Sequence, residues 1–551
     1  MIYQTGDAYP TKKVLGAKIN PMKNQFAFLC ILLFVCSNLI QAQKSSNKPP
    51  NIIVIFSDDH TQQTISAYGK SLMQTPNIDR IAKEGMIAKN AFVTNSICAP
   101  SRAVLLTGKY NHLNGLKDNS PRRFFDGNQQ QVQKLLKQKD YQTAWIGKWH
   151  LQTLPSGFDF FRILPDQGQY FQPNFINIPG DTTPYKGYTT NLITEFSTNW
   201  LDKRDTSKPF FLVVGEKATH RNWMPDVEDL GAFDHIDFPY PANFMDTYNG
   251  REAARLQDMT VDKTMVLQDD LKINVNWDKV GPGMFARLDP TQKAAYKKYY
   301  TEISKQYEAV KNDSAALLKF KFERYLKDYL ATAKSLDRGI GNILDYLAAH
   351  KLDQNTVVIY ASDQGFYMGE HGWFDKRFMY EESLRTPFVM RYPGHIKPGT
   401  QLQEMIVNID FAPTILNIAG IQTPSDMQGK SFLPLVAKTT PAAKKSFAAT
   451  WRKSMYYHYY EYPQPHHVAP HFGVRTTRYK LIRFYGPHNN WELFDLQKDP
   501  TEMNNLINDP SYASIITELK KELKDLMVHY QDLDALTIWN TTESTMQDMP
   551  K

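Results

Sequence analysis

The chain has 551 residues, of which 42% are hydrophobic and 22% charged, and its formal net charge is +7. This length allows one large and one smaller domain, and the composition is that of a globular protein, which excludes a disordered or fibrous chain. Three cysteines, Cys30, Cys36 and Cys98, are too few for a disulfide framework and lack the spacing of a metal site.

Residues 22–42 have the features of a secretory signal peptide. Lys23 lies in a charged flank, residues 26–35 form a short apolar run, and Ala42 is a small residue suited to cleavage. A membrane-spanning helix needs about 20 apolar residues, so this run is too short. We predict that residues 1–42 form an upstream extension and a cleaved signal peptide, and that the mature bacterial protein is periplasmic or secreted without stable membrane insertion. A retained signal anchor is the alternative.

Cleavage after Ala42 removes Cys30 and Cys36, so that Cys98 is the one cysteine left in the exported chain. It also removes four lysines and one aspartate, which leaves a net charge of +4. A nearly neutral chain without a basic run argues against nucleic acid as a partner.

Four apolar runs predict strands that are buried on both faces: residues 51–56, 143–146, 209–214 and 356–360. Helical segments lie between them, for example at residues 75–85 and 129–137, which indicates a parallel α/β sheet. Each run ends in polar residues. Because ligands bind outside the carboxyl ends of such strands, we expect these polar ends to meet at one edge of the sheet.

The polar strand ends carry acids and bases. Asp58 and Asp59 are adjacent carboxylates whose repulsion a cation would relieve, and Asp363 with Gln364 would complete a set of oxygen ligands. Oxygen ligands favour Ca²⁺ or Mg²⁺ over zinc. Positive charge and proton-transfer groups come from Lys148, His150, His220 and Lys376, which favours an anionic ester as substrate. Any one of these residues alone is more typical of a turn or a helix cap.

Cys98 begins the segment Cys-Ala-Pro-Ser-Arg-Ala-Val-Leu-Leu-Thr-Gly. Pro100 suits the first turn of a helix, so Cys98 is expected at a helix N-terminus, where backbone N–H groups favour anions. A buried, inert thiol is the alternative from spacing alone. The pattern C-x-P-S-R-x-x-x-L-x-x-G resembles, without a mismatch, the signature of the type I sulfatases.

The resemblance implies an alkaline-phosphatase-like α/β fold and assigns roles that spacing could not. A maturation enzyme would convert Cys98 to formylglycine, which would join Asp58, Asp59, Asp363 and Gln364 as ligands of Ca²⁺. Arg102 would hold the formylglycine hydrate, and Lys148 and Lys376 would bind the sulfate. A hydrate oxygen would attack sulfur while His220 protonates the leaving alcohol, and His150 would assist when the carbonyl re-forms and sulfate leaves.

Four further segments resemble bacterial N-acetylglucosamine-6-sulfatases: residues 168–171, 220–225, 369–376 and 455–462. This resemblance implies the 6-O-sulfate of N-acetylglucosamine in heparan, heparin, keratan or mucin glycans as the substrate. Another carbohydrate O-sulfate, a phosphoester or phosphonate hydrolase of the same superfamily, and a non-catalytic glycan-binding protein remain alternatives. Tyr170, Phe171, Trp223 and Trp373 in these segments could pack on a sugar ring, although such aromatics lie more often in the core or a lid. His466, His467 and His471 lie in a Pro-rich loop outside the segments and could equally reach sugar hydroxyls or be merely solvated.

The remaining pattern predicts the domain organisation. Residues 48–440 are expected to form the catalytic α/β domain, a large, mostly parallel sheet flanked by helices, with an insertion at residues 225–290. Apolar residues at i+3 and i+4 spacing predict helix over residues 291–350. A polar stretch ending at residue 445 is interpreted as a linker. Residues 446–535 are expected to form a smaller α+β domain, with short antiparallel strands, the first at residues 448–451, and a helix at residues 513–530.

Overall fold

The computed structural model describes residues 8, 10, 11 and 48–547. Contacts divide the chain into two units, Met1–Pro49 and Pro50–Lys551, and everything described below belongs to the second unit. The predicted signal peptide lies outside the described residues. In the part of the chain that the structure describes, no helix is long and apolar enough to cross a membrane.

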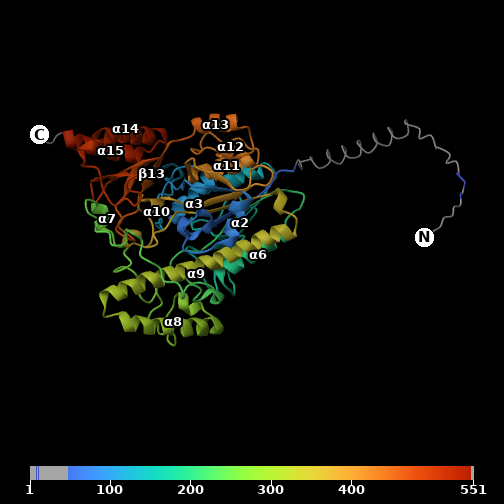
Figure 1. Ribbon diagram of the computed structural model, residues 1–551, viewed down its shortest axis with the longest axis horizontal. Coiled ribbons are helices and arrows are strands. Elements are labelled where there is room, and N and C mark those ends of the chain that lie inside the picture. The colour runs from blue at the N-terminus through green and yellow to red at the C-terminus, as the bar shows by residue number, and fades with distance from the viewer. Residues whose placement is uncertain (1–7, 9, 12–47, 548–551) are drawn as a thin grey trace, which may run out of the picture. The chain divides into compact units, whose positions relative to one another are not determined.

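A mixed, mostly parallel sheet forms the centre of the unit (Figure 1). Its central strands, β9, β1, β8, β4 and β5, run parallel, whereas β10, β6 and β7 run antiparallel to their neighbours. In spatial order the described strands are β11 (Thr400–Leu402), β2 (Met86–Ala88), β10 (Phe388–Arg391), β9 (Thr356–Ser362), β1 (Asn51–Ser57), β8 (Phe210–Gly215), β4 (Gln142–Lys148), β5 (Phe160–Leu164), β6 (Asn174–Asn177) and β7 (Thr182–Pro184).

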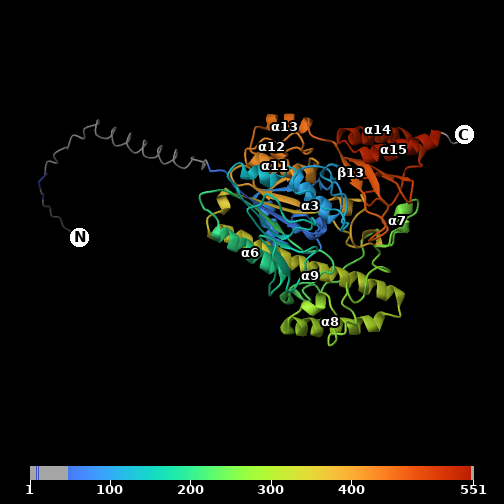
Figure 2. The same cartoon turned by 180° about the vertical axis from the view of Figure 1, so that it is seen from behind.

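The continuous apolar character of the central strands follows from helices that cover both faces of the sheet. In β1, Ile53 and Ile55 pack in one core, whereas Ile52, Val54 and Phe56 pack in the other, as the alternation of a strand requires. The first core is covered by α2 (Pro76–Glu84), α6 (Thr189–Lys203) and α9 (Ser314–Ala349). The second is covered by α3 (Cys98–Thr107), α5 (Val132–Lys137), α11 (Phe411–Ile418) and α12 (Leu433–Val436) (Figures 1 and 2).

The ends of β4 and β8 approach so closely that both need glycine. A Cβ atom on Gly147 would lie 2.0 Å from the carbonyl oxygen of Gly215, and one on Gly215 would lie 2.4 Å from the oxygen of Lys148. Gly147 also has φ of +103°, which side chains rarely adopt. These two glycines therefore bring Lys148 and Glu216 together at the carboxyl edge of the sheet.

Two helices, and not one, occupy the predicted helical region at residues 291–350. Helix α8 (Pro290–Val310) begins with a capping box formed by Asp289 and Gln292, and α9 begins at Asp313, whose side chain accepts from two backbone N–H groups. They form an arm on one side of the molecule (Figures 1 and 2). The expected insertion at residues 225–290 is mostly irregular and contains η3 (Val227–Asp229), α7 (Glu252–Leu256) and η4 (Met284–Arg287).

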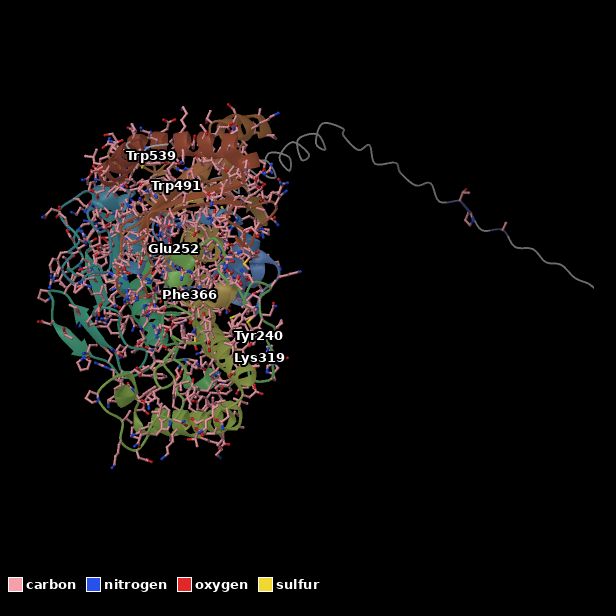
Figure 3. The ribbon with its side chains drawn as sticks, turned by 90° about the vertical axis from the view of Figure 1, so that its left-hand side faces the viewer. Tyr240, Glu252, Lys319, Phe366, Trp491 and Trp539 are labelled. Carbon is pink, nitrogen blue, oxygen red and sulfur yellow. The ribbon has the colours of Figure 1, made fainter. Side chains whose placement is uncertain are left out.

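A second, antiparallel sheet follows in the order β13 (Ser454–Tyr459), β14 (His471–Thr476), β15 (Tyr479–Phe484) and β16 (Trp491–Asp495). It packs with α14 (Ala513–His529), which confirms the predicted C-terminal helix, and is followed by α15 (Leu533–Gln547). Figure 3 shows Phe366 between this C-terminal part, marked by Trp491 and Trp539, and Lys319 of α9 with Tyr240 of the insertion beside it.

Two predictions in this region are wrong. The polar stretch interpreted as a linker contains α13 (Pro441–Ala449), which Thr440 caps by accepting from the backbone of Ala443. Its alanines and lysines favour helix, and composition alone concealed this. The first strand of the C-terminal sheet was expected at residues 448–451, but that strand is β13, at residues 454–459. The other short described elements are β3 (Ala91–Phe92), β12 (Ile406–Val407), α4 (Asn111–Asn114), α10 (Glu381–Leu384), η1 (Gln62–Thr64), η2 (Ser66–Tyr68), η5 (Asp353–Asn355), η6 (Glu370–Gly372), η7 (Asn408–Asp410) and η8 (Pro510–Tyr512).

Candidate active site

Cys98 is the first residue of α3 and is fully buried at the carboxyl edge of the large sheet. Its Sγ atom lies 3.2 Å from Oδ1 of Asp58, 3.5 Å from Nζ of Lys376 and 3.7 Å from Nε2 of Gln364. Burial raises the pKa of the Cys98 thiol to about 12. Because a nucleophilic cysteine needs a lowered pKa, the unmodified thiol is a poor nucleophile in this position.

Three carboxylates meet beside Cys98. Oxygen atoms of Asp58, Asp59 and Asp363 lie within 4.8 Å of one another, and the backbone N–H of Asp59 donates to Asp363 at 3.1 Å. Burial raises the pKa of Asp59 to about 6, against the opposing effect of Lys376, and Asp363 raises it further. The backbone of Asp59 is in the left-handed region, with φ of 59°, a conformation that often marks functional residues.

Three buried cations balance these acids. Nζ of Lys148 contacts Asp58, Nζ of Lys376 lies 2.6 Å from both oxygens of Asp59, and Arg102 donates to Asp363 at 3.1 and 3.2 Å. Each carboxylate is therefore paired with a cation from another element.

The donor set fits a hard cation. The three carboxylates present oxygen atoms close enough to share one ion, and Oε1 of Gln364 is buried without a hydrogen-bond partner among the described residues. The amide of Gln364 contacts Asp59 at 2.5 Å through the atom assigned as nitrogen. Rotation of the amide by 180° would turn its oxygen toward Asp59, where it could ligate the same cation.

His220 and His150 lie on the same edge. Nδ1 of His220 donates to the carbonyl oxygen of Arg221 at 2.7 Å, and its ring lies with Asp58 and Cys98 in a group whose ligand atoms are within 4.8 Å. Burial, together with Lys148, holds the pKa of His220 well below its usual range. An anionic substrate opposes the effect of the lysines, which is what a proton donor in this place requires.

A cleft of about 720 Å³ opens over these residues. Asp59, His220 and Lys376 line its floor together with Gln167, while its outer wall comes from two loops at residues 118–123 and 460–466. Asp375 and Arg377, on either side of Lys376, also line it. Its volume is in the range of small-molecule sites. Of the predicted metal ligands and catalytic residues, Asp59, His220 and Lys376 line this cleft.

Most of the candidate sugar contacts pack in the core, and only His466 and His467 do not. Trp223, Trp373, Tyr170 and Phe171 are at most 4% exposed and pack in the core, so they offer no ring face to a ligand. His471 is also buried and accepts from the backbone of Met379. His467 is half-exposed and pairs with Asp258, whereas His466 lines the cleft and lies 3.2 Å from Asp375.

Comparison with known families decides the identity of this fold. Residues 50–421 match the family described as "Sulfatase", and residues 369–529 match "N-sulphoglucosamine sulphohydrolase, C-terminal". The chain belongs to the sulfatase family. It is therefore a sulfuric ester hydrolase, and the predicted α/β fold with a smaller C-terminal antiparallel sheet is confirmed.

Individual relatives of this sulfatase match over nearly their whole length. It is 43% identical over 529 residues to an N-acetylglucosamine-6-O-sulfatase from Bacteroides thetaiotaomicron, covering 94% of this chain and 92% of the relative. A solved structure in complex with its substrate D-glucosamine-2-N,6-O-disulfate superposes with a TM-score of 0.84 at 44% identity, covering 88% and 99% of the two chains. The phosphonate monoester hydrolase of Agrobacterium radiobacter shares the fold at a TM-score of 0.63 and 17% identity, with coverage of 87% and 96%.

Sequence reasoning missed two residues of the sulfatase site, Gln167 and Lys217. Lys217 is buried, donates to the carbonyl oxygen of Gln167 at 3.1 Å and lies 4.7 Å from the centre of the Tyr170 ring. Burial lowers the pKa of Lys217 to about 8. Lys217 follows β8 in the same polar segment as His220. Its position after a buried strand could therefore have identified it as a candidate site residue. Gln167 lies on a loop after an unpredicted strand, β5, and carried no such signal.

Proposed function

We propose that the protein is a calcium-dependent sulfatase that releases the 6-O-sulfate of N-acetylglucosamine by means of formylglycine at position 98. One observation carries the proposal: Cys98, a thiol that burial makes unreactive, lies at the centre of three carboxylates and three cations beneath a cleft. This environment suits a modified nucleophile that acts on an anionic ester. The sulfatase signature around Cys98 supports its conversion to formylglycine.

Calcium would be held by Asp58, Asp59, Asp363 and Gln364, together with the modified residue 98. When bound, the ion would stabilise negative charge on sulfate oxygens. The formylglycine, once made by a maturation enzyme, would supply a hydrated aldehyde as the nucleophile.

The chain's own residues would divide the remaining work. Lys148 and Lys376 would bind the sulfate group, and Arg102, buried against Asp363 and the carbonyl oxygen of Lys148, would hold residue 98 in position. Nδ1 of His220 is fixed by a carbonyl oxygen, which leaves its Nε2 to carry a proton to the departing alcohol. His150 would assist the release of sulfate.

The substrate assignment rests on the relatives. One is named an N-acetylglucosamine-6-O-sulfatase, and the substrate-bound structure contains a 6-O-sulfated glucosamine. Arg123, Arg221 and Arg377 line the cleft, each paired with an acid, and their guanidinium groups would face the further anionic groups of heparan or heparin. Keratan and mucin glycans carry the same 6-sulfated sugar and remain in the proposal.

Export completes the proposal. The signal peptide predicted at residues 22–42 would deliver the protein to the periplasm or the exterior, where a sulfated polysaccharide is accessible. The mature chain would have a sulfated saccharide and the maturation enzyme as partners and would make no stable membrane insertion.

The test has two parts. Mass analysis of the tryptic peptide 90–102 from exported protein is expected to show an aldehyde in place of the thiol, and sulfate release is expected from 6-O-sulfated N-acetylglucosamine. The Cys98→Ala variant serves as the control and should release none. Release only from 2-O- or N-sulfated sugars would overturn the substrate, while an unmodified thiol in active protein would overturn the mechanism. Chelation and re-addition of calcium tests the metal.

A further inference from the structure

Gln167 lies between two residues of the candidate site. It belongs to the loop that follows β5, and its side chain reaches Lys148 on one side and His150 on the other. Nζ of Lys148 donates to Oε1 of Gln167 at 2.5 Å, and Nε2 of Gln167 lies 3.1 Å from Nε2 of His150. Gln167 also lines the cleft. No other described side chain shows a hydrogen bond to both residues.

Lys148 determines which way the Gln167 amide points. Burial lowers the pKa of Lys148 well below its usual range, but Nζ contacts the Asp58 carboxylate, a partner that favours the ammonium form. An ammonium group has hydrogens to donate and no lone pair. The amide oxygen therefore faces Lys148, because the reverse orientation would place two donors against each other. It follows that the amide N–H₂ faces His150.

The orientation of the amide fixes the proton on the histidine ring. A nitrogen that receives a hydrogen bond must carry the lone pair, so Nε2 of His150 is the acceptor and the proton of the neutral ring lies on Nδ1. Burial lowers the pKa of His150 to about 4, so the ring is neutral at pH 7. Nδ1 is buried and has no hydrogen-bond partner among the described residues.

We propose that Gln167 is a positioning residue that holds neutral His150 with its proton on Nδ1, so that the buried Nδ1 is a hydrogen-bond donor. The role of that donor in catalysis rests on the proposed function, whereas the position of the proton does not. In this arrangement Nδ1 cannot accept a proton. A proton gained by His150 would enter at Nε2, where Oδ1 of Asp166 lies 3.4 Å away.

The loop is anchored so that Gln167 keeps this place. The carbonyl oxygen of Gln167 accepts a hydrogen bond from Nζ of Lys217 at 3.1 Å. The hydroxyl of Tyr170, in the same loop, donates to the carbonyl oxygen of His220 at 2.5 Å. Asp166 and Gly168, on either side of Gln167, both have φ in the left-handed region. The turn that they form directs the Gln167 side chain toward Lys148 and His150, and these contacts join the loop to two strand ends.

The experiment determines which ring nitrogen of His150 carries the proton. Protein labelled with ¹⁵N in its histidine rings and left with an unmodified Cys98 is examined at pH 7 by ¹⁵N NMR, and the His150 signals are assigned from a His150→Asn sample. Wild-type protein is expected to show a protonated Nδ1 and an unprotonated Nε2. The Gln167→Glu variant keeps the shape but offers only oxygens, so the proton is expected on Nε2. In Gln167→Leu, Asp166 is the remaining neighbour of Nε2, and the same change is expected.

The control is Gln169→Leu, two residues along the loop and outside the cleft lining, which should leave the His150 signals unchanged. A wild-type ring with its proton on Nε2 would overturn the proposal. An unchanged Nδ1 proton in both Gln167 variants would overturn it as well, because Gln167 would then not set the tautomer.

Activity separates this inference from the proposed function. In matured protein, Gln167→Leu is expected to lower kcat by about 10- to 100-fold with a smaller change in KM, while Gln169→Leu keeps both. Wild-type protein that shows the expected tautomer but releases no sulfate would refute the proposed function and leave the positioning intact. A tautomer change without loss of kcat would show that the proton position is irrelevant to catalysis.

Discussion

Two buried groups of charges in this molecule are built differently. One is the candidate site around Cys98. The other, here called the seam cluster, consists of Glu381, Arg385 and Arg475 and joins α10 to the C-terminal sheet. In the seam cluster Arg475 donates to both oxygens of Glu381 and to the backbone of Thr476, and Arg385 donates to Glu381 at 2.5 Å. Although burial opposes ionisation, Arg475 and its neighbours hold the pKa of Glu381 well below its usual range.

The candidate site has the same kinds of residue but an incomplete set of contacts. Within the described part of the chain, Nδ1 of His150 and Oε1 of Gln364 lack hydrogen-bond partners, and both Asp59 and His150 have left-handed backbone conformations. Buried charge by itself therefore does not identify function in this fold. The left-handed backbone of Asp59 and His150, together with these two unpartnered atoms, distinguishes the site from the three residues of the seam cluster, which also border a cleft.

The largest effect is expected at Lys376. Replacing Lys376 by Met should lower kcat/KM about 10²- to 10³-fold, because a cation that stabilises sulfate charge is lost. With calcium present, the free energy of unfolding in urea should change far less than in the seam variant below. If the variant is severely destabilised but its folded fraction has normal activity, Lys376 has a structural role, as the seam cluster does, and not a catalytic one.

Arg475→Met should produce the opposite pattern. Removing one partner of a buried pair leaves Glu381 undercompensated and is expected to lower the free energy of unfolding by about 3 kcal/mol. The kcat of the folded fraction should stay within about twofold of wild type. Arg80→Met is the matched control, since Arg80 and its partner Asp345 are 38% and 68% exposed, and it should show no measurable loss. Loss of kcat in folded Arg475→Met would break the comparison.

Calcium removal should affect the site alone. At a calcium concentration 100-fold above Kd, binding is expected to add about 2.7 kcal/mol of stability, and chelation should remove it. The measurement is the melting temperature with chelator, then with calcium restored. Asp59→Asn should reduce the shift strongly, whereas Arg475→Met should keep it. A shift of equal size in Asp59→Asn would show that calcium binds elsewhere.

The smallest effect is expected at Glu216, a buried acid beside the site whose side chain accepts from Thr190 at 3.1 Å. Burial raises its pKa from 4.5 to about 8, so the folded state binds a proton that the unfolded state releases. Stability from this group is thus present below pH 4.5 and is lost as the pH rises toward 8. Glu216→Gln should flatten this slope and add about 1–3 kcal/mol at pH 8.

Exposed Glu195 on α6 provides the control for that experiment. Glu195→Gln should leave the dependence of unfolding free energy on pH unchanged. If both variants behave alike, the slope arises from other groups and Glu216 is ionised in the folded protein.

Sequence predicted the parts of the site that local pattern encodes. The buried strands β1, β4, β8 and β9 were recognised because continuous apolar runs end abruptly in polar residues, and Asp58 and Asp363 follow from two of them. Cys98 was found through a contiguous motif. These features depend on residues that are neighbours along the chain, so they can be predicted without knowledge of the fold.

The remaining features depend on contacts between distant segments. Gln167 acquires its role only because its loop, which follows β5, folds back onto Lys148 and His150 at the end of the neighbouring strand β4. Trp223 and Trp373 could not be placed from sequence, because an aromatic side chain suits a core and a sugar platform equally, and burial alone decided between them.

The cleft also has a consequence for how such enzymes change. Asp59 and His220 in its floor follow the ends of β1 and β8, where a shift of one residue would disturb the whole sheet, whereas its outer wall comes from loops at residues 118–123 and 460–466. One of these loops, residues 460–466, connects β13 to β14 in the C-terminal sheet. Insertions and substitutions there can alter which glycan fits while the sulfate-cleaving apparatus is inherited unchanged. Divergence of specificity within one chemistry is thus an architectural property of this fold.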